Sequence, residues 1–256
     1  MSTFKFFPEG WKSEDTEETK DILQGIVKNC DKDYNLHVEL KNGMHGIIPR
    51  QEIEAINVDE KGYPKENLCI GKVHKYVQFK LKEKDGDKLI FSRKDVQQEV
   101  LNSVKTDLKV GDNIKGIVKN ITPYGAFIDI GGGVVGLAYI EDLSVARIKT
   151  PYERLKIGQN VNIVVKSINR ETGKISLSYK DTLGTWEENA KRFSVGMNTK
   201  GIIRETEKNK NGIFIELTPN LVGMAEYKEG LKYGEKVDLY IKKIDDDKKK
   251  VKVVLL

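Results

Sequence analysis

The chain has 256 residues, of which 38% are hydrophobic and 32% are charged, and its formal net charge is +5. This length allows two or three small domains, and so polar a composition predicts a soluble protein with extensive surface. The mildly basic charge permits a nucleic-acid partner without requiring one, and the absence of an apolar run of about 18 residues excludes a membrane-spanning helix.

Residues 1–20 are predicted to form an N-terminal tail that is rich in aromatic side chains. The aromatic cluster contains Phe4, Phe6, Phe7 and Trp11, with Pro8 among them. Because aromatic side chains favour burial, we expect the cluster to pack against the first folded domain. An arm that docks on a partner is the alternative.

Residues 21–95 are predicted to form a first β-barrel, because they repeat a pattern found again in residues 108–181. Gly46-Ile-Ile-Pro-Arg-Gln-Glu-Ile53 aligns with Gly136-Leu-Ala-Tyr-Ile-Glu-Asp-Leu143. The closing segment Phe91-Ser-Arg-Lys-Asp95 likewise aligns with Leu177-Ser-Tyr-Lys-Asp181. Residues 96–107 follow as a helical linker, because Val96, Val100, Leu101 and Val104 recur at helical spacing.

Residues 108–181 carry the clearest strand pattern. Apolar Ile128 and Ile130 alternate with Phe127 and Asp129, which is the period of a β-strand with two different faces. Glycines at 131–133 predict a turn, and further strands and a short helix at 140–155 follow. Five short strands with one short helix are typical of a closed Greek-key barrel, the OB-fold.

Residues 195–256 are predicted to form a third, shortened barrel, joined to the second by a linker at 182–194. Gly212-Ile-Phe-Ile-Glu-Leu217 aligns with Gly125-Ala-Phe-Ile-Asp-Ile130, and Gly223-Met-Ala-Glu226 aligns with Gly136-Leu-Ala-Tyr139. The helix between strands is reduced to residues 227–233. The predicted fold is therefore mainly β, with three tandem five-stranded OB-fold barrels joined by short helical linkers.

Three aromatic residues are expected on one polar face of the middle barrel, with basic residues around them. The rings are Tyr124, Phe127 and Tyr139, and the basic residues are Lys119, Arg170 and Lys174. Single-stranded nucleic acid needs this combination, because bases stack on rings and lysine or arginine neutralises phosphates. The alternative is that the rings cover the core or a neighbouring domain.

The middle segment resembles the S1 RNA-binding domain, the repeat of ribosomal protein S1. The resemblance is carried by Gly116-Ile-Val118, Tyr124-Gly-Ala-Phe127, Gly136-Leu-Ala-Tyr139, Lys174 and Leu177-Ser-Tyr-Lys180. Tyr139 stands where this family usually has His, and Asn169 stands where it usually has Asp. The resemblance implies an RNA site formed by Tyr124, Phe127, Tyr139, Lys119, Asn169, Arg170 and Lys174.

The outer repeats keep only part of this site, so we expect weaker RNA binding from them. The first repeat retains Tyr34 and His37 but has Pro49 at the position of Tyr139, and a protein-contact role is its alternative. The third repeat retains Phe214 and a basic turn that ends at Lys250, but Glu226 replaces the last ring.

No motif indicates an enzyme, a metal site or a cofactor. The three histidines lack metal-ligand spacing with Cys30 or Cys69, and Gly131-Gly-Gly133 lies between strands rather than before a helix. With no signal peptide, the cysteines are expected to be reduced thiols in a cytoplasmic protein, each buried as a small hydrophobe.

The predicted function is binding of single-stranded RNA, especially mRNA, in translation or its regulation. The resemblance implies the small ribosomal subunit as a further partner, and no membrane partner is expected. Two alternatives remain open: an accessory factor in RNA turnover or transcription, and a protein-interaction scaffold. The scaffold hypothesis predicts that another domain covers the rings.

Overall fold

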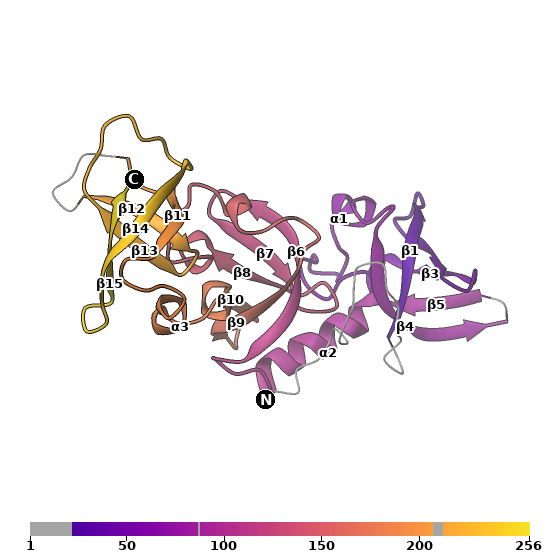
Figure 1. The fold of residues 1–256 in the computed structure, drawn as a ribbon. Coiled ribbons are helices and arrows are strands. Elements are labelled where there is room, and N and C mark those ends of the chain that lie inside the picture. The colour runs from indigo at the N-terminus through magenta and orange to yellow at the C-terminus, as the bar shows by residue number, and fades with distance from the viewer. Residues whose placement is uncertain (1–21, 87, 207–211) are drawn as a thin grey trace.

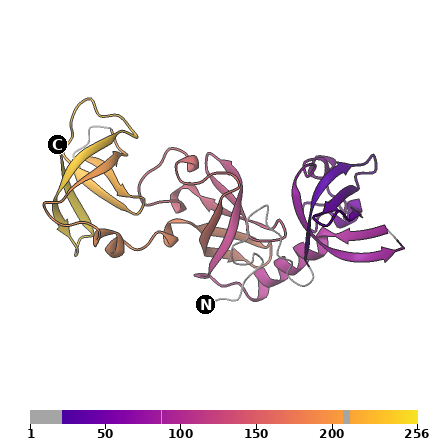
Figure 2. The same ribbon diagram turned by 45° about the vertical axis from the view of Figure 1, so that its right-hand side comes forward.

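The computed structural model describes residues 22–86, 88–206 and 212–256, which form three β-barrels in a row (Figures 1 and 2). Each barrel is closed and has five strands. The predicted fold of three tandem five-stranded barrels is therefore confirmed. The aromatic cluster of the N-terminal tail lies outside the described residues.

The three barrels share one topology. The first contains β1 (Leu23–Cys30), β2 (Leu36–Leu40), β3 (His45–Ile48), β4 (Tyr76–Asp85) and β5 (Lys88–Ser92). The second contains β6 (Asn113–Thr122), β7 (Gly125–Asp129), β8 (Val135–Tyr139), β9 (Asn160–Asn169) and β10 (Lys174–Ser178). The third contains β11 (Asn198–Ile203), β12 (Ile213–Thr218), β13 (Leu221–Ala225), β14 (Lys236–Asp245) and β15 (Lys250–Leu255). In each barrel the third and fifth strands pair in parallel, and the first and fourth pair antiparallel.

Each barrel has its own hydrophobic core, because alternate residues of its strands point inward. In the second barrel Ile128, Ile163 and Leu177 are fully buried. In the first barrel, Cys69 is buried and Cys30 is half-buried against the core. Burial raises the pKa of both thiols.

The connection between the third and fourth strands differs from barrel to barrel. The first barrel has η1 (Arg50–Glu52) and α1 (Glu66–Ile70) there, and the second has η2 (Ile140–Asp142) and η3 (Pro151–Glu153). The prediction of one helix over 140–155 is wrong. The backbone between η2 and η3 contacts the third barrel instead of forming a helix, since the Ala146 N–H donates to the Pro219 carbonyl.

Helix α2 (Arg93–Thr106) joins the first two barrels, as its apolar spacing predicted (Figure 1). Its buried residues Val100 and Val104 belong to the core of the second barrel. The 131–133 turn rests against this helix, and the Gly132 N–H donates to Gln78 Oε1 of the first barrel at 3.0 Å. A Cβ on Gly132, whose φ is +58°, would lie 3.1 Å from Val96 Cγ1. The glycine-rich turn is therefore a contact between domains.

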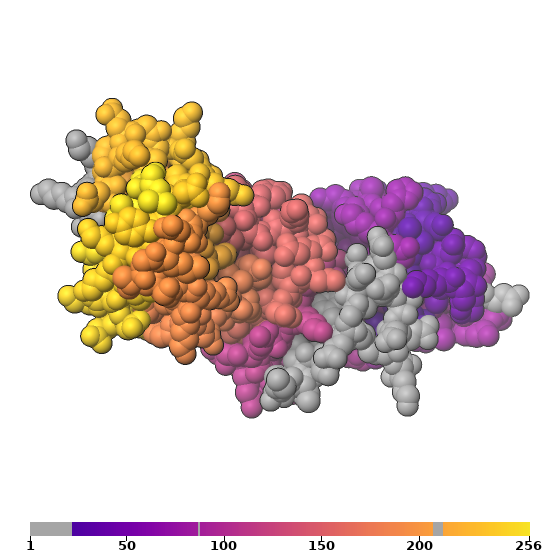
Figure 3. Space-filling view, viewed as in Figure 1, coloured from indigo at the N-terminus to yellow at the C-terminus, as the bar shows by residue number. Residues whose placement is uncertain are grey.

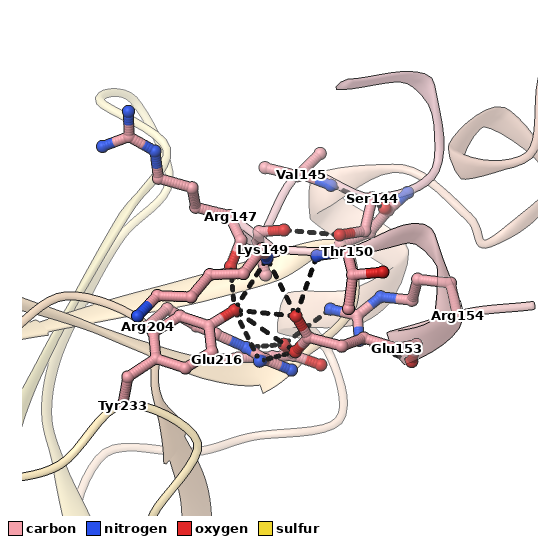
Figure 4. A network of polar contacts seen from close by, with 12 residues as sticks. Ser144, Val145, Arg147, Lys149, Thr150, Glu153, Arg154, Arg204, Glu216 and Tyr233 are labelled. Atoms are coloured by element: carbon pink, nitrogen blue, oxygen red, sulfur yellow. Dashed lines mark hydrogen bonds and ion pairs between the residues drawn. The ribbon is translucent and has the colours of Figure 1, made fainter. Parts of the chain in front are cut away.

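A buried charged network joins the second and third barrels (Figure 4). Glu216 of β12 accepts hydrogen bonds at 2.6 Å from Arg154 and from Arg204. The side chains of these three residues are at most 7% exposed. Arg204 also pairs with Glu153 of η3, to which Tyr233 donates at 3.0 Å. The link between these barrels is therefore ionic as well as covalent.

The covalent link is η4 (Lys180–Thr182) followed by α3 (Trp186–Ala190). Trp186 packs against the core of the third barrel. The space-filling view shows the three barrels as one continuous row, with the second in contact with both others (Figure 3). Within the described residues, no helix is long and apolar enough to cross a membrane.

Candidate nucleic-acid interface

The outer surface of β7 and β8 carries the three aromatic residues of the predicted site. Phe127 of β7 is paired with Leu137 of β8, and Gly125 is paired with Tyr139. The neighbouring residues Ala126 and Ala138 are fully buried, so the alternate residues point outward. We call the group formed by Tyr124, Phe127 and Tyr139 the ring face.

Two of these rings are open to solvent, and the third supports them. Tyr124 is 52% exposed and Tyr139 is 42% exposed, whereas Phe127 is half-buried. The ring centroids of Tyr124 and Phe127 are 6.1 Å apart, with an angle of 83° between the ring planes. This edge-to-face geometry is a favoured arrangement of aromatic pairs, and it leaves a face of Tyr124 free to meet a base.

Gly125 allows the ring face to form. A Cβ at this position would lie 2.4 Å from the Ala138 carbonyl oxygen and 3.0 Å from Tyr139 Cα. Any side chain would therefore push β8 away from β7. The lack of a side chain lets the strand that carries Tyr139 approach the strand that carries Phe127.

Lys119 lies at the edge of the ring face. It occupies an irregularity of β6 between Val118 and Asn120, and Asn120 is paired with Phe127. Its Nζ lies 3.4 Å from Asp129 Oδ2, and the lysine side chain is 46% exposed. Asp129 also accepts from the backbone of Gly131. The ammonium group is thus held beside the rings and still reaches solvent.

Lys174 and Asn169 form the first pair of the β9–β10 hairpin. Lys174 is exposed and lies two positions before Ser176, which is paired with Leu137, so Lys174 points to the same side of the sheet as the ring face. The Asn169 Oδ1 atom accepts from the backbone of Glu171 at 3.1 Å and of Thr172 at 2.9 Å. Asn169 therefore shapes the turn that presents Lys174.

Arg170 is not brought to the rings. Its guanidinium donates to the carbonyl oxygens of Val104, Lys105 and Leu108 at the end of α2, with Nη2 lying 3.1 Å from the Leu108 oxygen. The cation thereby interacts with the negative end of the helix dipole. This position links the second barrel to α2.

The first barrel places its two predicted residues in local contacts. The guanidinium carbon of Arg50 lies 4.7 Å from the centroid of the Tyr34 ring and 5.6 Å from that of Tyr63. His37 Nε2 lies 3.2 Å from Asp31 Oδ2. Sequence reasoning missed Arg50, which covers the ring that a base would need.

In the third barrel, Phe214 is half-buried on the outer face of β12, where it pairs with Met224 of β13. Lys250 opens β15 opposite Asp245, which accepts from the Lys248 backbone at 3.1 Å. Glu226 follows β13 and is exposed. Its position matches that of Tyr139, since a Cβ on Gly212 would lie 3.8 Å from Glu226 Cα.

The structure thus brings together Tyr124, Phe127, Tyr139 and Lys119, with Lys174 on the same side of the sheet. It separates Arg170 from them. Across the described residues, no group of three histidine, cysteine, aspartate or glutamate side chains could hold a metal ion. The site that these residues form offers rings and ammonium groups, which suit a ligand with flat bases and negative charge.

Comparisons with known proteins identify the family of two segments of the chain. Residues 16–94 and 107–180 match the family described as the S1 RNA binding domain. The small ribosomal subunit protein bS1 of Staphylococcus aureus (strain MRSA252) is 37% identical over 194 residues, which cover 68% of this chain and 49% of that protein. The bS1 protein of Chlamydia muridarum is 28% identical over 232 residues, which cover 85% of this chain and 40% of that protein.

The chain therefore spans about half the length of the curated relatives it matches. Among solved structures, GSP13 from Bacillus subtilis is 32% identical, covers 30% of this chain and 60% of its own, and superposes with a TM-score of 0.29. Because the family match extends over more than half of the residues, the chain belongs to the S1 RNA binding domain family.

Proposed function

We propose that the chain binds single-stranded RNA through the ring face of its second barrel. The observation that carries this proposal is the exposure of Tyr124 and Tyr139, which are 52% and 42% exposed beside Phe127. The scaffold hypothesis requires another domain over these rings, and none of the described residues buries them. Large exposed aromatic groups with cations beside them favour a nucleic-acid ligand.

In the proposed mechanism, unpaired bases stack on Tyr124 and Tyr139 while Phe127 holds the Tyr124 ring on edge. Lys119 and Lys174 neutralise the phosphates on either side, and Asn169 shapes the turn before Lys174. Stacking is sequence-tolerant because every base has a flat face, so the expected preference among base sequences is slight. The chemistry needs no cofactor and makes this a binding protein rather than an enzyme.

The first barrel would contribute less. Binding of a base to Tyr34 would have to displace Arg50, which also donates two hydrogen bonds to the Pro64 carbonyl, at 3.0 and 3.3 Å. His37 would have to leave Asp31. We propose that the units 21–95, 108–181 and 195–256 act in tandem, so that weak outer sites raise affinity through effective concentration.

We propose a role in translation, with mRNA as the RNA and the small ribosomal subunit as a partner. The support is that the curated relatives are small ribosomal subunit proteins. Co-sedimentation with 30S subunits, with and without mRNA, would test this part separately from RNA binding itself.

The test of RNA binding uses a fluorescent single-stranded RNA of about a dozen nucleotides, which lies within the roughly 4–16 nucleotides that one barrel of this type binds. Anisotropy titrations at two salt concentrations compare the wild type with Tyr139→Ala and with the double variant Phe127→Ala/Tyr139→Ala. Each stacked base contributes about 1–3 kcal/mol, so Tyr139→Ala should weaken binding roughly 5- to 140-fold, and the double variant should lose at least as much.

The matched control is Tyr152→Ala, which removes a ring that is 55% exposed on the same barrel but outside the ring face. Circular dichroism melts confirm that each variant is folded, because Phe127 is half-buried. Duplex DNA serves as the control ligand. Equal affinities for Tyr139→Ala and Tyr152→Ala would refute the ring face as the RNA site.

A further inference from the structure

A lysine occupies the same irregular position of the fourth strand in all three barrels. The residues are Lys82 in β4, Lys166 in β9 and Lys242 in β14. Each lies where the register with the fifth strand shifts, between Leu81 and Glu83, between Val165 and Ser167, and between Ile241 and Lys243. The three lysines are thus structurally equivalent, and their surroundings can be compared directly.

In the first two barrels this lysine is paired with a buried acid. Lys82 Nζ lies 2.5 Å from Glu52 of η1, and Lys166 Nζ lies 2.8 Å from both carboxylate oxygens of Asp142 of η2. The acid side chains are 9% and 0% exposed. These hydrogen bonds raise the pKa of both lysines. In each case the acid belongs to a 3-10 turn that follows the third strand.

Among the described residues, the third barrel has no 3-10 turn between β13 and β14. Residues 226–235 connect β13 to β14 without a helical turn. Glu229, the acid that the repeat alignment places opposite Asp142, is exposed in this connection. Lys242 is exposed, and no ion pair joins it to any of the described residues. Lys252 of β15 is exposed beside it, opposite Lys243.

A cleft of about 750 Å³ lies beside Lys242 and Lys252. Its lining includes Met224, Glu226, Tyr227, Tyr240, Lys242 and Lys252. This volume lies within the range of roughly 300–1,000 Å³ that is typical of small-ligand sites. The residue of the second barrel that corresponds to Val254 is Ser178, and it is fully buried.

The strand pairing orders the lining in two rows. Tyr240 of β14 is paired with Val254 of β15, and Glu226 continues this row beyond the end of β13. Lys252 is paired with Met224 and lies next to Lys242. The first row contains the half-buried Tyr240 ring, with the Glu226 carboxylate as a hydrogen-bond acceptor at the other end. The second row contains the ammonium groups of Lys242 and Lys252. β15 lies between the strands of Tyr240 and Glu226, so their backbones are about 10 Å apart. A base over Tyr240 and Val254 and the extended Glu226 side chain can together span this distance.

We propose that this cleft binds one nucleotide of single-stranded RNA, with the base on Tyr240 and Val254 and the phosphate on Lys242 and Lys252. The Glu226 carboxylate accepts a hydrogen bond from an exocyclic amino group of the base, and it repels phosphate from its own end of the cleft. Adenine, cytosine and guanine carry such an amino group and uracil does not, so we expect a preference for the first three. The inference rests on the proposed RNA binding, and it gives the third barrel an RNA-binding site of its own.

The test uses the full chain with fluorescent oligoadenylate and oligouridylate, each of about a dozen nucleotides. The double variant Lys242→Glu/Lys252→Glu is compared with Lys232→Glu/Lys236→Glu, which makes the same charge change on exposed residues of the third barrel outside the cleft. The cleft variant should weaken oligoadenylate binding by about tenfold or more beyond the control, because it replaces phosphate contacts by repulsion.

Both variants are also built on the Phe127→Ala/Tyr139→Ala background. A further loss there for the cleft variant supports the proposal, because the ring face no longer contributes. Equal binding by the cleft and control variants, in a protein that still binds RNA, would overturn the cleft while leaving the ring face intact. A wild type that binds neither oligonucleotide would refute the proposed function itself.

Base selection is tested with Glu226→Gln. A glutamine side chain can donate as well as accept, so this variant should lose preference for oligoadenylate over oligouridylate relative to the wild type. If Glu226→Gln keeps the wild-type preference for oligoadenylate over oligouridylate, the contact between Glu226 and the base is refuted.

Discussion

Removing the Glu216 carboxylate should separate the second and third barrels. The variant Glu216→Ala leaves two buried guanidinium groups without their shared acceptor, since Arg154 and Arg204 both donate to Glu216 Oε2 at 2.6 Å. Arg204 keeps Glu153 as a partner. Arg154, whose side chain is 7% exposed, is left with a hydrogen bond to the Glu153 backbone carbonyl at 3.2 Å.

Breaking a buried ion pair by removing one partner costs about 3–5 kcal/mol, because the remaining charge is uncompensated. We expect the free energy of unfolding of the two C-terminal barrels to fall by about this amount. Urea unfolding followed by tryptophan fluorescence measures it, since Trp186 packs against the core of the third barrel. The second variant, Glu216→Ala/Arg154→Leu, should recover part of the loss by removing one unpaired charge.

Glu229→Ala is the matched control, because it removes the same charge from an exposed site on the third barrel and should change stability by no more than about 0.5 kcal/mol. If Glu216→Ala lowers the free energy of unfolding no more than this control does, the charged network does not hold the two barrels together. No recovery in the double variant would contradict the assignment of the cost to Arg154.

Two further predictions concern the contacts between barrels. Gly132→Ala should destabilise the first two barrels more than Gly111→Ala does in a thermal melt, because both residues have positive φ but only Gly132 would place a Cβ against α2; equal shifts in Tm would exclude the contact with α2. Acid should weaken the contact between the second and third barrels through Glu153. Burial raises the pKa of Glu153, but hydrogen bonds from the Lys149 backbone, Tyr233 and Arg204 outweigh burial and lower this pKa from 4.5. Its stabilising contribution is thus complete above pH 4.5 and is lost as the pH falls through the lower folded pKa, so urea unfolding between pH 7 and pH 3 should show a smaller acid loss for Glu153→Gln than for the wild type.

The barrels could be predicted from the sequence because their signals are local. Alternation of Ile128 and Ile130 with Phe127 places strands and faces without knowledge of the rest of the chain. The repeated motifs then extend the same barrel to both sides. Helix α2 was predictable for the same reason, since Val96, Val100 and Val104 lie on one helical face and are fully buried.

The ring face was also predictable, because its three rings belong to one hairpin and the turn before it. Arg170 was harder, because a cation in a turn can reach several neighbours. Its partner is the end of α2, whose carbonyl oxygens are about 60 positions earlier in the chain. The role of Arg50 over Tyr34 was hidden as well, since the second ring around it, Tyr63, lies in a loop of irregular structure.

The sequence by itself determined three tandem barrels, the faces of their strands and the residues that meet across one hairpin, because period-two alternation and short turns act over a few residues. Only the tertiary structure decided which charges are buried together and which surfaces stay open. Arg154 of the second barrel meets Arg204 and Glu216 of the third in one network. Lys166 is paired with Asp142, whereas no ion pair joins the equivalent Lys242 to another described residue. The physical reason is that the burial and pairing of a side chain depend on which distant residues the folded chain places beside it. Local sequence periodicity does not identify those residues.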